Sequence, residues 1–83
     1  MTQINISVKD MKGIETPLHI LNNKTINEGK IILGHDINRV WKFDGTILEG
    51  NKTFLYYEVE NGETIIATDK VVGGIIKKNI LNF

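Results

Sequence analysis

The chain has 83 residues, of which 41% are hydrophobic and 24% are charged, as is ordinary for a globular protein. This length predicts a single domain spanning residues 1–83, with a thin core. Ten Lys and Arg residues balance ten Asp and Glu residues. Domains that bind nucleic acids are usually basic, so this balance argues against that role, and a net charge near zero favours self-association. The absence of cysteine excludes disulfides and thiolate metal sites.

The first ten residues, MTQINISVKD, carry no basic stretch followed by an apolar run, so no signal peptide is predicted. No part of the sequence approaches the roughly 18 consecutive apolar residues that a membrane helix needs. We therefore expect a cytoplasmic protein that makes no membrane contact.

The N-terminal third of the sequence predicts two strands. Residues 2–8 alternate apolar and polar side chains, which is typical of a half-buried strand. The inward-facing side chains of this strand are Ile4, Ile6 and Val8. Residues 9–13 are polar, end in glycine and predict a turn. Residues 14–21 form the second predicted strand, and Pro17, which has no N–H, places it on an edge or bends it.

The middle of the chain predicts further strands. Residues 30–33 are a short apolar run ended by Gly34, which we interpret as a buried strand. Residues 37–43 follow as another strand. One face of that strand carries Ile37, Arg39, Trp41 and Phe43. The Asp44–Gly45 dipeptide is a two-residue hairpin signal, and the simplest role for Trp41 is packing in the core against Leu48.

The strongest predicted hairpin joins residues 54–59 to residues 64–68. Between them lies Asn61–Gly62, whose residues tolerate the positive φ angles of a type I′ turn. This register puts one set of side chains on the core face: Leu55, Tyr57, Val59, Thr64, Ile66 and Thr68. The opposite face carries Phe54, Tyr56, Ile65 and Ala67. Residues 37–68 would then form a four-strand antiparallel meander.

The last segment, residues 69–81, has two interpretations. In the first it is a helix that Asp69 caps, and in the second it is a hairpin with Gly73–Gly74 as its turn. Whichever holds, about six short strands separated by turns predict a mainly-β fold. The predicted architecture is a small antiparallel barrel or sandwich. The first interpretation of residues 69–81 adds a short C-terminal helix to it.

The sequence offers little for chemistry. His35–Asp36 is the nearest approach to a catalytic pair, but adjacent side chains rarely face each other and no nucleophile signature lies nearby. His19 and His35 have no spaced carboxylate that would complete a metal site, and the glycines form no phosphate-binding pattern. We therefore predict no enzymatic activity, no cofactor, no metal and no small-molecule substrate.

The predicted hairpin leaves Phe54, Tyr56 and Ile65 pointing away from the core, and exposed aromatic patches often mark protein contacts. Our hypothesis is a non-catalytic protein-binding or assembly module: an adaptor, an inhibitor or a structural component, of the kind that phages also encode. Its partner would be another protein or a second copy, bound through this face or through a free strand edge.

The alternative is a small barrel that binds single-stranded nucleic acid through Arg39, Lys42 and Tyr56. In such proteins exposed rings stack on bases while neighbouring cations meet phosphates.

Overall fold

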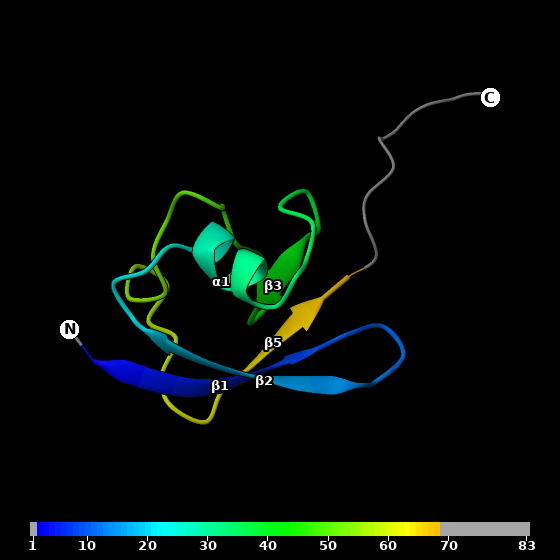
Figure 1. The fold of residues 1–83 in the computed structure, drawn as a ribbon, viewed down its shortest axis with the longest axis horizontal. Coiled ribbons are helices and arrows are strands. Elements are labelled where there is room, and N and C mark those ends of the chain that lie inside the picture. The colour runs from blue at the N-terminus through cyan, green and yellow to red at the C-terminus, as the bar shows by residue number, and fades with distance from the viewer. Residues whose placement is uncertain (1, 69–83) are drawn as a thin grey trace.

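The computed structural model describes residues 2–68, which form one five-stranded sheet with a short helix against one face (Figure 1). In chain order the elements are β1 (Gln3–Lys9), β2 (Glu15–Leu21), α1 (Ile26–Ile32), β3 (Trp41–Phe43), β4 (Thr46–Ile47) and β5 (Thr64–Ala67). The segment 69–81, predicted as a helix or a hairpin, lies outside the described residues. Within residues 2–68 no helix is long and apolar enough to cross a membrane.

The sheet is mixed and open. Its strand order is β2-β1-β5-β3-β4, in which β5 lies parallel to β1 and antiparallel to β3. The mainly-β prediction is confirmed, but the predicted purely antiparallel barrel or sandwich is wrong. An antiparallel barrel has no parallel pair and no edge, whereas β2 and β4 each have one side that no strand of residues 2–68 pairs with.

The first two strands form the hairpin that the sequence predicts. Ile4 faces Ile20 and Ile6 faces Leu18 across an antiparallel pair. The turn is held by the Asp10 carboxylate, which accepts hydrogen bonds from the N–H groups of Lys12 and Ile14 at 2.9 Å each. Pro17 lies on β2, which is an edge strand, as expected from its missing N–H.

The apolar run at residues 30–33, predicted as a strand, instead forms the end of α1. The helix begins at a capping box, in which the Thr25 hydroxyl accepts from the Glu28 N–H at 3.2 Å. In return the Glu28 carboxylate accepts from the Thr25 N–H at 2.8 Å. Gly29 faces the sheet, where an added Cβ would lie 2.8 Å from Cζ of Phe54. The helix therefore packs closely onto this ring.

Residues 54–59, predicted as the central strand, form a compact turn. The Glu58 N–H donates to the Leu55 carbonyl at 2.9 Å, the Val59 N–H donates to the Phe54 carbonyl at 3.1 Å, and Glu58 has a positive φ of 57°. The predicted hairpin and the four-strand meander are therefore wrong. The Asn61–Gly62 dipeptide docks on β1 instead: the Asn5 N–H donates to the Asn61 side chain and the Gly62 N–H donates to the Asn5 carbonyl.

The Asp44–Gly45 turn is confirmed. Both residues have positive φ angles, 55° and 79°, as a type I′ turn requires. The turn pairs Phe43 with Thr46 and Lys42 with Ile47.

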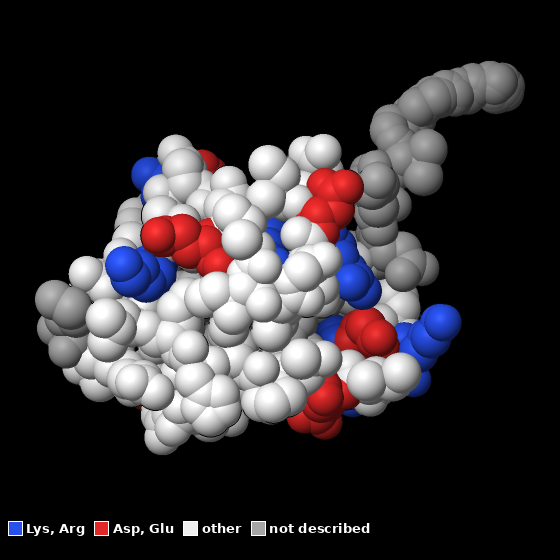
Figure 2. All heavy atoms as spheres, in the orientation of Figure 1, with Lys and Arg blue, Asp and Glu red and all other residues white. Residues whose placement is uncertain are grey.

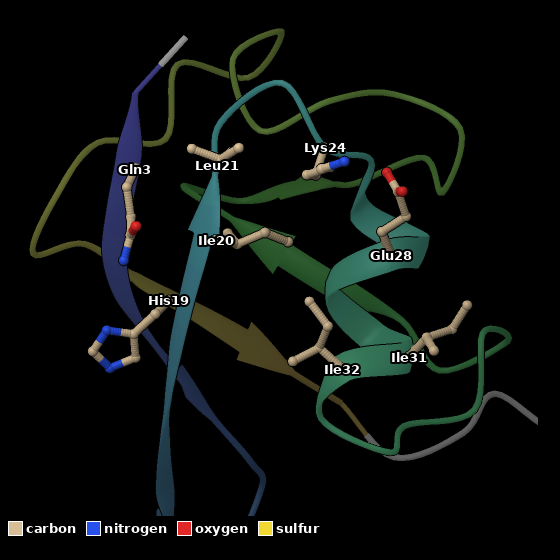
Figure 3. A pocket seen from close by; sticks show the side chains of 8 residues that line it. All are labelled: Gln3, His19, Ile20, Leu21, Lys24, Glu28, Ile31 and Ile32. Atoms are coloured by element: carbon tan, nitrogen blue, oxygen red, sulfur yellow. The ribbon is translucent and has the colours of Figure 1, made fainter.

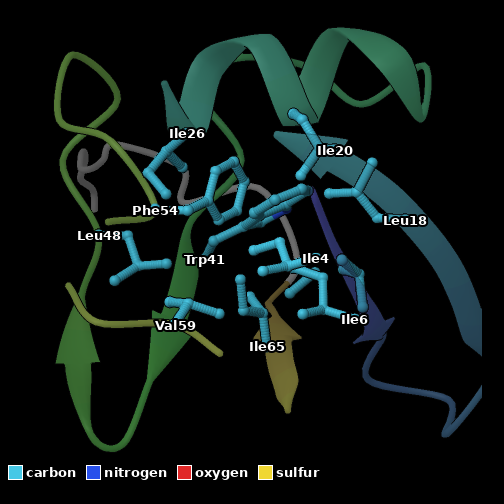
Figure 4. Packing of buried hydrophobic residues seen from close by; sticks show 12 residues of the cluster. Ile4, Ile6, Leu18, Ile20, Ile26, Trp41, Leu48, Phe54, Val59 and Ile65 are labelled. Atoms are coloured by element: carbon cyan, nitrogen blue, oxygen red, sulfur yellow. The ribbon is translucent and has the colours of Figure 1, made fainter. Parts of the chain in front are cut away.

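The core lies between α1 and the sheet (Figure 4). Trp41, Phe54 and Ile65 are each 0% exposed, so the prediction that Trp41 packs inside is confirmed. The inward face of β5 is the opposite of the predicted one. Ile65 and Ala67 are buried, whereas Ile66 is exposed, because β5 inserts between β1 and β3 instead of pairing with residues 54–59.

Candidate protein-binding surfaces

His35 holds the loop between α1 and β3. The Trp41 indole N–H donates to His35 Nδ1 at 3.2 Å, and the two rings meet edge to face at 5.6 Å. Burial lowers the pKa of His35, and the nearby Arg39 guanidinium lowers it further. The neutral ring is thus the favoured form, which suits an acceptor for the indole. The neighbouring Asp36 carboxylate accepts from the Asn38 N–H, so His35 and Asp36 serve separate turns of this loop.

Lys30 is a buried cation next to the core, with 4% of its surface exposed. Its ammonium donates to the Ile37 carbonyl at 3.1 Å and lies 6.0 Å from the centre of the Trp41 ring. Burial lowers the pKa of Lys30, and the charge of Asp36 opposes that effect. Lys30 therefore ties α1 to the following loop. Within residues 2–68, no cluster of three His, Asp or Glu side chains is arranged to hold a metal ion.

The predicted protein-binding face does not exist as expected. Phe54 and Ile65 lie in the core, because residues 54–59 turn the Phe54 ring under α1 and β5 turns Ile65 inward. Tyr56 alone is exposed, at 62%, with Lys52 Nζ 4.9 Å from the centre of its ring. The Tyr57 ring meets the Tyr56 ring edge-on.

The three residues of the nucleic-acid alternative are not brought together. The turn that carries Tyr56 is hydrogen-bonded to Asn22 and Lys24, before the start of α1. Arg39 lies in the loop after the end of α1, and its Nε donates to the Thr68 carbonyl at 3.0 Å. Lys42 lies on the face of the sheet away from the core. This dispersal removes the continuous groove that base stacking beside phosphate contacts would need.

The face of the sheet away from α1 carries an apolar pair with a cation between them. Lys42 on β3 faces Ile47 on β4 and Ile66 on β5, so the three side chains form one row across three strands. Ile47 is 59% exposed and Ile66 is 39% exposed. Among the described residues the Lys42 ammonium has no hydrogen bond or ion pair. We call these residues the Ile47–Lys42–Ile66 row.

A groove of about 450 Å³ lies between β2 and α1. Its apolar wall comes from Ile20 and Leu21 on the strand and from Ile31 and Ile32 on the helix, with Lys24 and Glu28 at one end (Figure 3). Ile31 and Ile32 are 65% and 59% exposed, which is unusual for two adjacent isoleucines. Figure 2 shows the uncharged surface over this region, with charged side chains around its margins.

The backbone along this groove has unpaired hydrogen-bonding groups. The Asn22 N–H bonds to the Thr2 carbonyl and the Asp10 N–H to the Ile14 carbonyl, so the even-numbered residues of β2 pair with β1. The odd-numbered residues therefore point their N–H and C=O groups outward. From Pro17 to Leu21, the outward groups without a partner in residues 2–68 are the Pro17 and His19 carbonyls and the His19 and Leu21 N–H groups. The Leu21 carbonyl already accepts from the Lys24 N–H at 3.1 Å.

Neither of these two surfaces follows from the strands that the sequence predicts. The sequence pattern places Ile66 on the core face, and it places Ile31 and Ile32 in a buried strand. The spacing Thr25-x-x-Glu28 is a capping-box pattern and indicates a helix at this point. That signal would have placed Ile31 and Ile32 on a helix surface.

The fold resembles that of a known class of domain. The ubiquitin-like (UBL) domain of Plasmodium falciparum Dsk2 superimposes with a TM-score of 0.74 and 25% sequence identity, over 81% of this chain and 97% of that domain. No protein-family model and no curated protein matches the sequence. Residues 2–68 therefore have a ubiquitin-like fold, in which one mixed five-stranded sheet packs against one short helix.

Proposed function

We propose that this protein is a non-catalytic binding module that recruits another protein through the open face of its sheet. Ubiquitin-like domains typically serve as protein-interaction modules, and the likeness to the Dsk2 domain supports the same class of function here. The adaptor, inhibitor or structural role expected from the sequence belongs to this class.

The observation that carries the proposal is the Ile47–Lys42–Ile66 row. Two exposed isoleucines flank one cation, and no other described element covers them. Burying the isoleucines would contribute at about 25 cal/mol per Å² of apolar surface removed from water. The complementary partner presents a carboxylate between two apolar side chains, so that the Lys42 ammonium is paired when it is desolvated.

The row is preorganised. Lys42 is hydrogen-bonded into the centre of three strands, and the type I′ turn at Asp44–Gly45 fixes the position of Ile47 opposite it. Beneath the row, Trp41 and Ala67 pack in the core. A rigid surface loses little conformational entropy on binding, which favours affinity.

Photo-cross-linking in the protein's native cells tests this proposal. A benzophenone amino acid replaces Thr64, which is exposed on β5 two residues before Ile66, and in a control it replaces Met11 in the β1–β2 turn. We expect an adduct of defined mass from position 64 and none of that mass from position 11. The adduct should disappear when Lys42→Glu or Ile66→Ser is added. An adduct that persists in both backgrounds would reject the row as the contact surface.

A further inference from the structure

We infer that the free edge of β2 is an interface between two copies of this chain, in which the two β2 strands pair antiparallel about a two-fold axis at His19. This surface is separate from the Ile47–Lys42–Ile66 row, so the inference stands independently of the proposed function. The pairing would join the two sheets into one continuous sheet.

The backbone groups of this edge complement themselves in one register. With His19 opposite His19 of the second copy, each His19 N–H donates to the opposite His19 carbonyl. The same register places Pro17 opposite Leu21 of the second copy, and each Leu21 N–H donates to the opposite Pro17 carbonyl. All the free groups between Pro17 and Leu21 are then paired.

The two backbone groups that cannot form a hydrogen bond between the copies also lie opposite each other. Proline supplies no N–H, and the Leu21 carbonyl opposite it is already bonded to the Lys24 N–H. In this register the absent donor therefore faces the occupied acceptor. A slip of two residues places Pro17 opposite His19 and leaves both His19 carbonyls facing a position without a donor. The edge thus favours one register for a second copy.

The side chains beside this edge favour the same arrangement. A two-fold axis perpendicular to the sheet places both α1 helices on one side, so the two apolar grooves face each other. The exposed Ile31 and Ile32 of each copy then lose contact with water. With Lys and Arg equal in number to Asp and Glu, no net repulsion opposes the approach.

The two edges of the sheet differ in how far they are protected. Edge strands are usually made unattractive by shortness, by lysines or by prolines. β4 is two residues long, whereas β2 is seven residues long and its only charged residue is Glu15 at the beginning. Pro17 is the one protective residue within β2, and the register above accommodates it.

A cysteine cross-link tests the register directly, because the chain has no cysteine of its own. In a hydrogen-bonded antiparallel pair the Cα atoms lie about 5.5 Å apart, within the range of a disulfide. His19→Cys should therefore form a disulfide-linked dimer under mild oxidation. The control is Asn5→Cys, an exposed position directly opposite His19 on the interior strand β1. Equal rates of dimer formation for the two variants would overturn the inference.

His19→Pro tests the hydrogen bonds. Pro17 shows that an outward-facing position of β2 accepts proline, so the β1–β2 pairing should survive. Each copy loses one donor, and we expect the dissociation constant from sedimentation equilibrium to rise at least about tenfold. Ile32→Lys, at an exposed position, should weaken the dimer without relying on proline.

Three results would overturn the inference: a wild-type chain that remains monomeric at several hundred micromolar, a dimer that neither variant weakens, and an edge that pairs only with a strand of a different protein. The cross-link from position 64 should persist in the His19→Pro variant. Loss of this cross-link in a folded variant would count against the separation of the two surfaces. A monomeric wild-type chain would overturn the β2 interface but would not bear on the proposed function of the Ile47–Lys42–Ile66 row.

Discussion

The β1–β2 hairpin and the segment from residue 54 to residue 63 carry equally strong local patterns, yet only the first folds as the pattern predicts. In the hairpin, β1 has one apolar and one polar side, and β2 buries Leu18 and Ile20 opposite it, so a single register buries the apolar side chains. In the second segment both sides carry apolar residues. Phe54 and Tyr57 then find partners elsewhere: the ring of Phe54 packs under α1, and the Tyr57 hydroxyl accepts from the Glu49 N–H at 2.7 Å.

This difference teaches that alternation determines structure when only one of the two faces can be buried. Where both faces are apolar, contacts with distant parts of the chain decide which side chains enter the core. The following substitutions test that conclusion.

The largest effect is expected at Phe54. Phe54→Ala would leave a cavity beneath Gly29, and we expect a loss of about 3–5 kcal/mol in the free energy of unfolding, measured by denaturant titration. The control is Leu55→Ala at the adjacent position, which is 56% exposed and should change stability by less than about 0.5 kcal/mol. A larger loss from Leu55→Ala than from Phe54→Ala would mean that Leu55 faces the core, as in the predicted hairpin.

Gly29→Ala should destabilise the protein, although alanine is the better helix former by about 1 kcal/mol. The added Cβ would lie 2.8 Å from Phe54 Cζ, so the ring must move, and overpacking of this kind costs about 1–3 kcal/mol. Combining it with Phe54→Leu should recover part of the loss, since the smaller side chain makes room. Stabilisation by Gly29→Ala alone would mean that α1 does not pack closely on this ring.

Thr25→Ala should lower the free energy of unfolding by about 1 kcal/mol, because it removes the acceptor for the Glu28 N–H at the start of α1. Thr46→Ala, an exposed threonine in β4, is a matched control. Thermal unfolding of the two variants gives the comparison. Equal effects would show that the capping box contributes nothing to the beginning of the helix.

Glu58→Gly should have the smallest effect on stability. The sign of that effect distinguishes the observed turn at residues 54–59 from the strand that the sequence predicts there. Glu58 has a positive φ of 57°, which glycine adopts without strain, so stability should rise by about 0.5–1 kcal/mol. In the predicted strand the same substitution would lower stability by a similar amount. Glu60→Gly, at an exposed position outside the described strands, serves as the control in the same denaturant titration.

The sites were less predictable than the fold. The free strand edge was anticipated as a general mode of contact, but neither its identity nor its register follows from the sequence. Those depend on which residues of β2 bond to β1 and on the Lys24 N–H that occupies the Leu21 carbonyl. The Ile47–Lys42–Ile66 row depends on β5 lying beside β3, a pairing between residues far apart in the sequence.

The sequence by itself determined the first hairpin, the Asp44–Gly45 turn, the burial of Trp41 and the mainly-β character of the protein. Each of these depends on backbone φ preferences, on alternation with one apolar face, or on the size of one side chain, all of which act locally. Only the tertiary structure decided that β5 inserts in parallel between β1 and β3, and that Phe54 and Ile65 turn inward. Long-range packing decides which strands are neighbours and which of two apolar faces is buried. No short stretch of sequence determines that packing by itself.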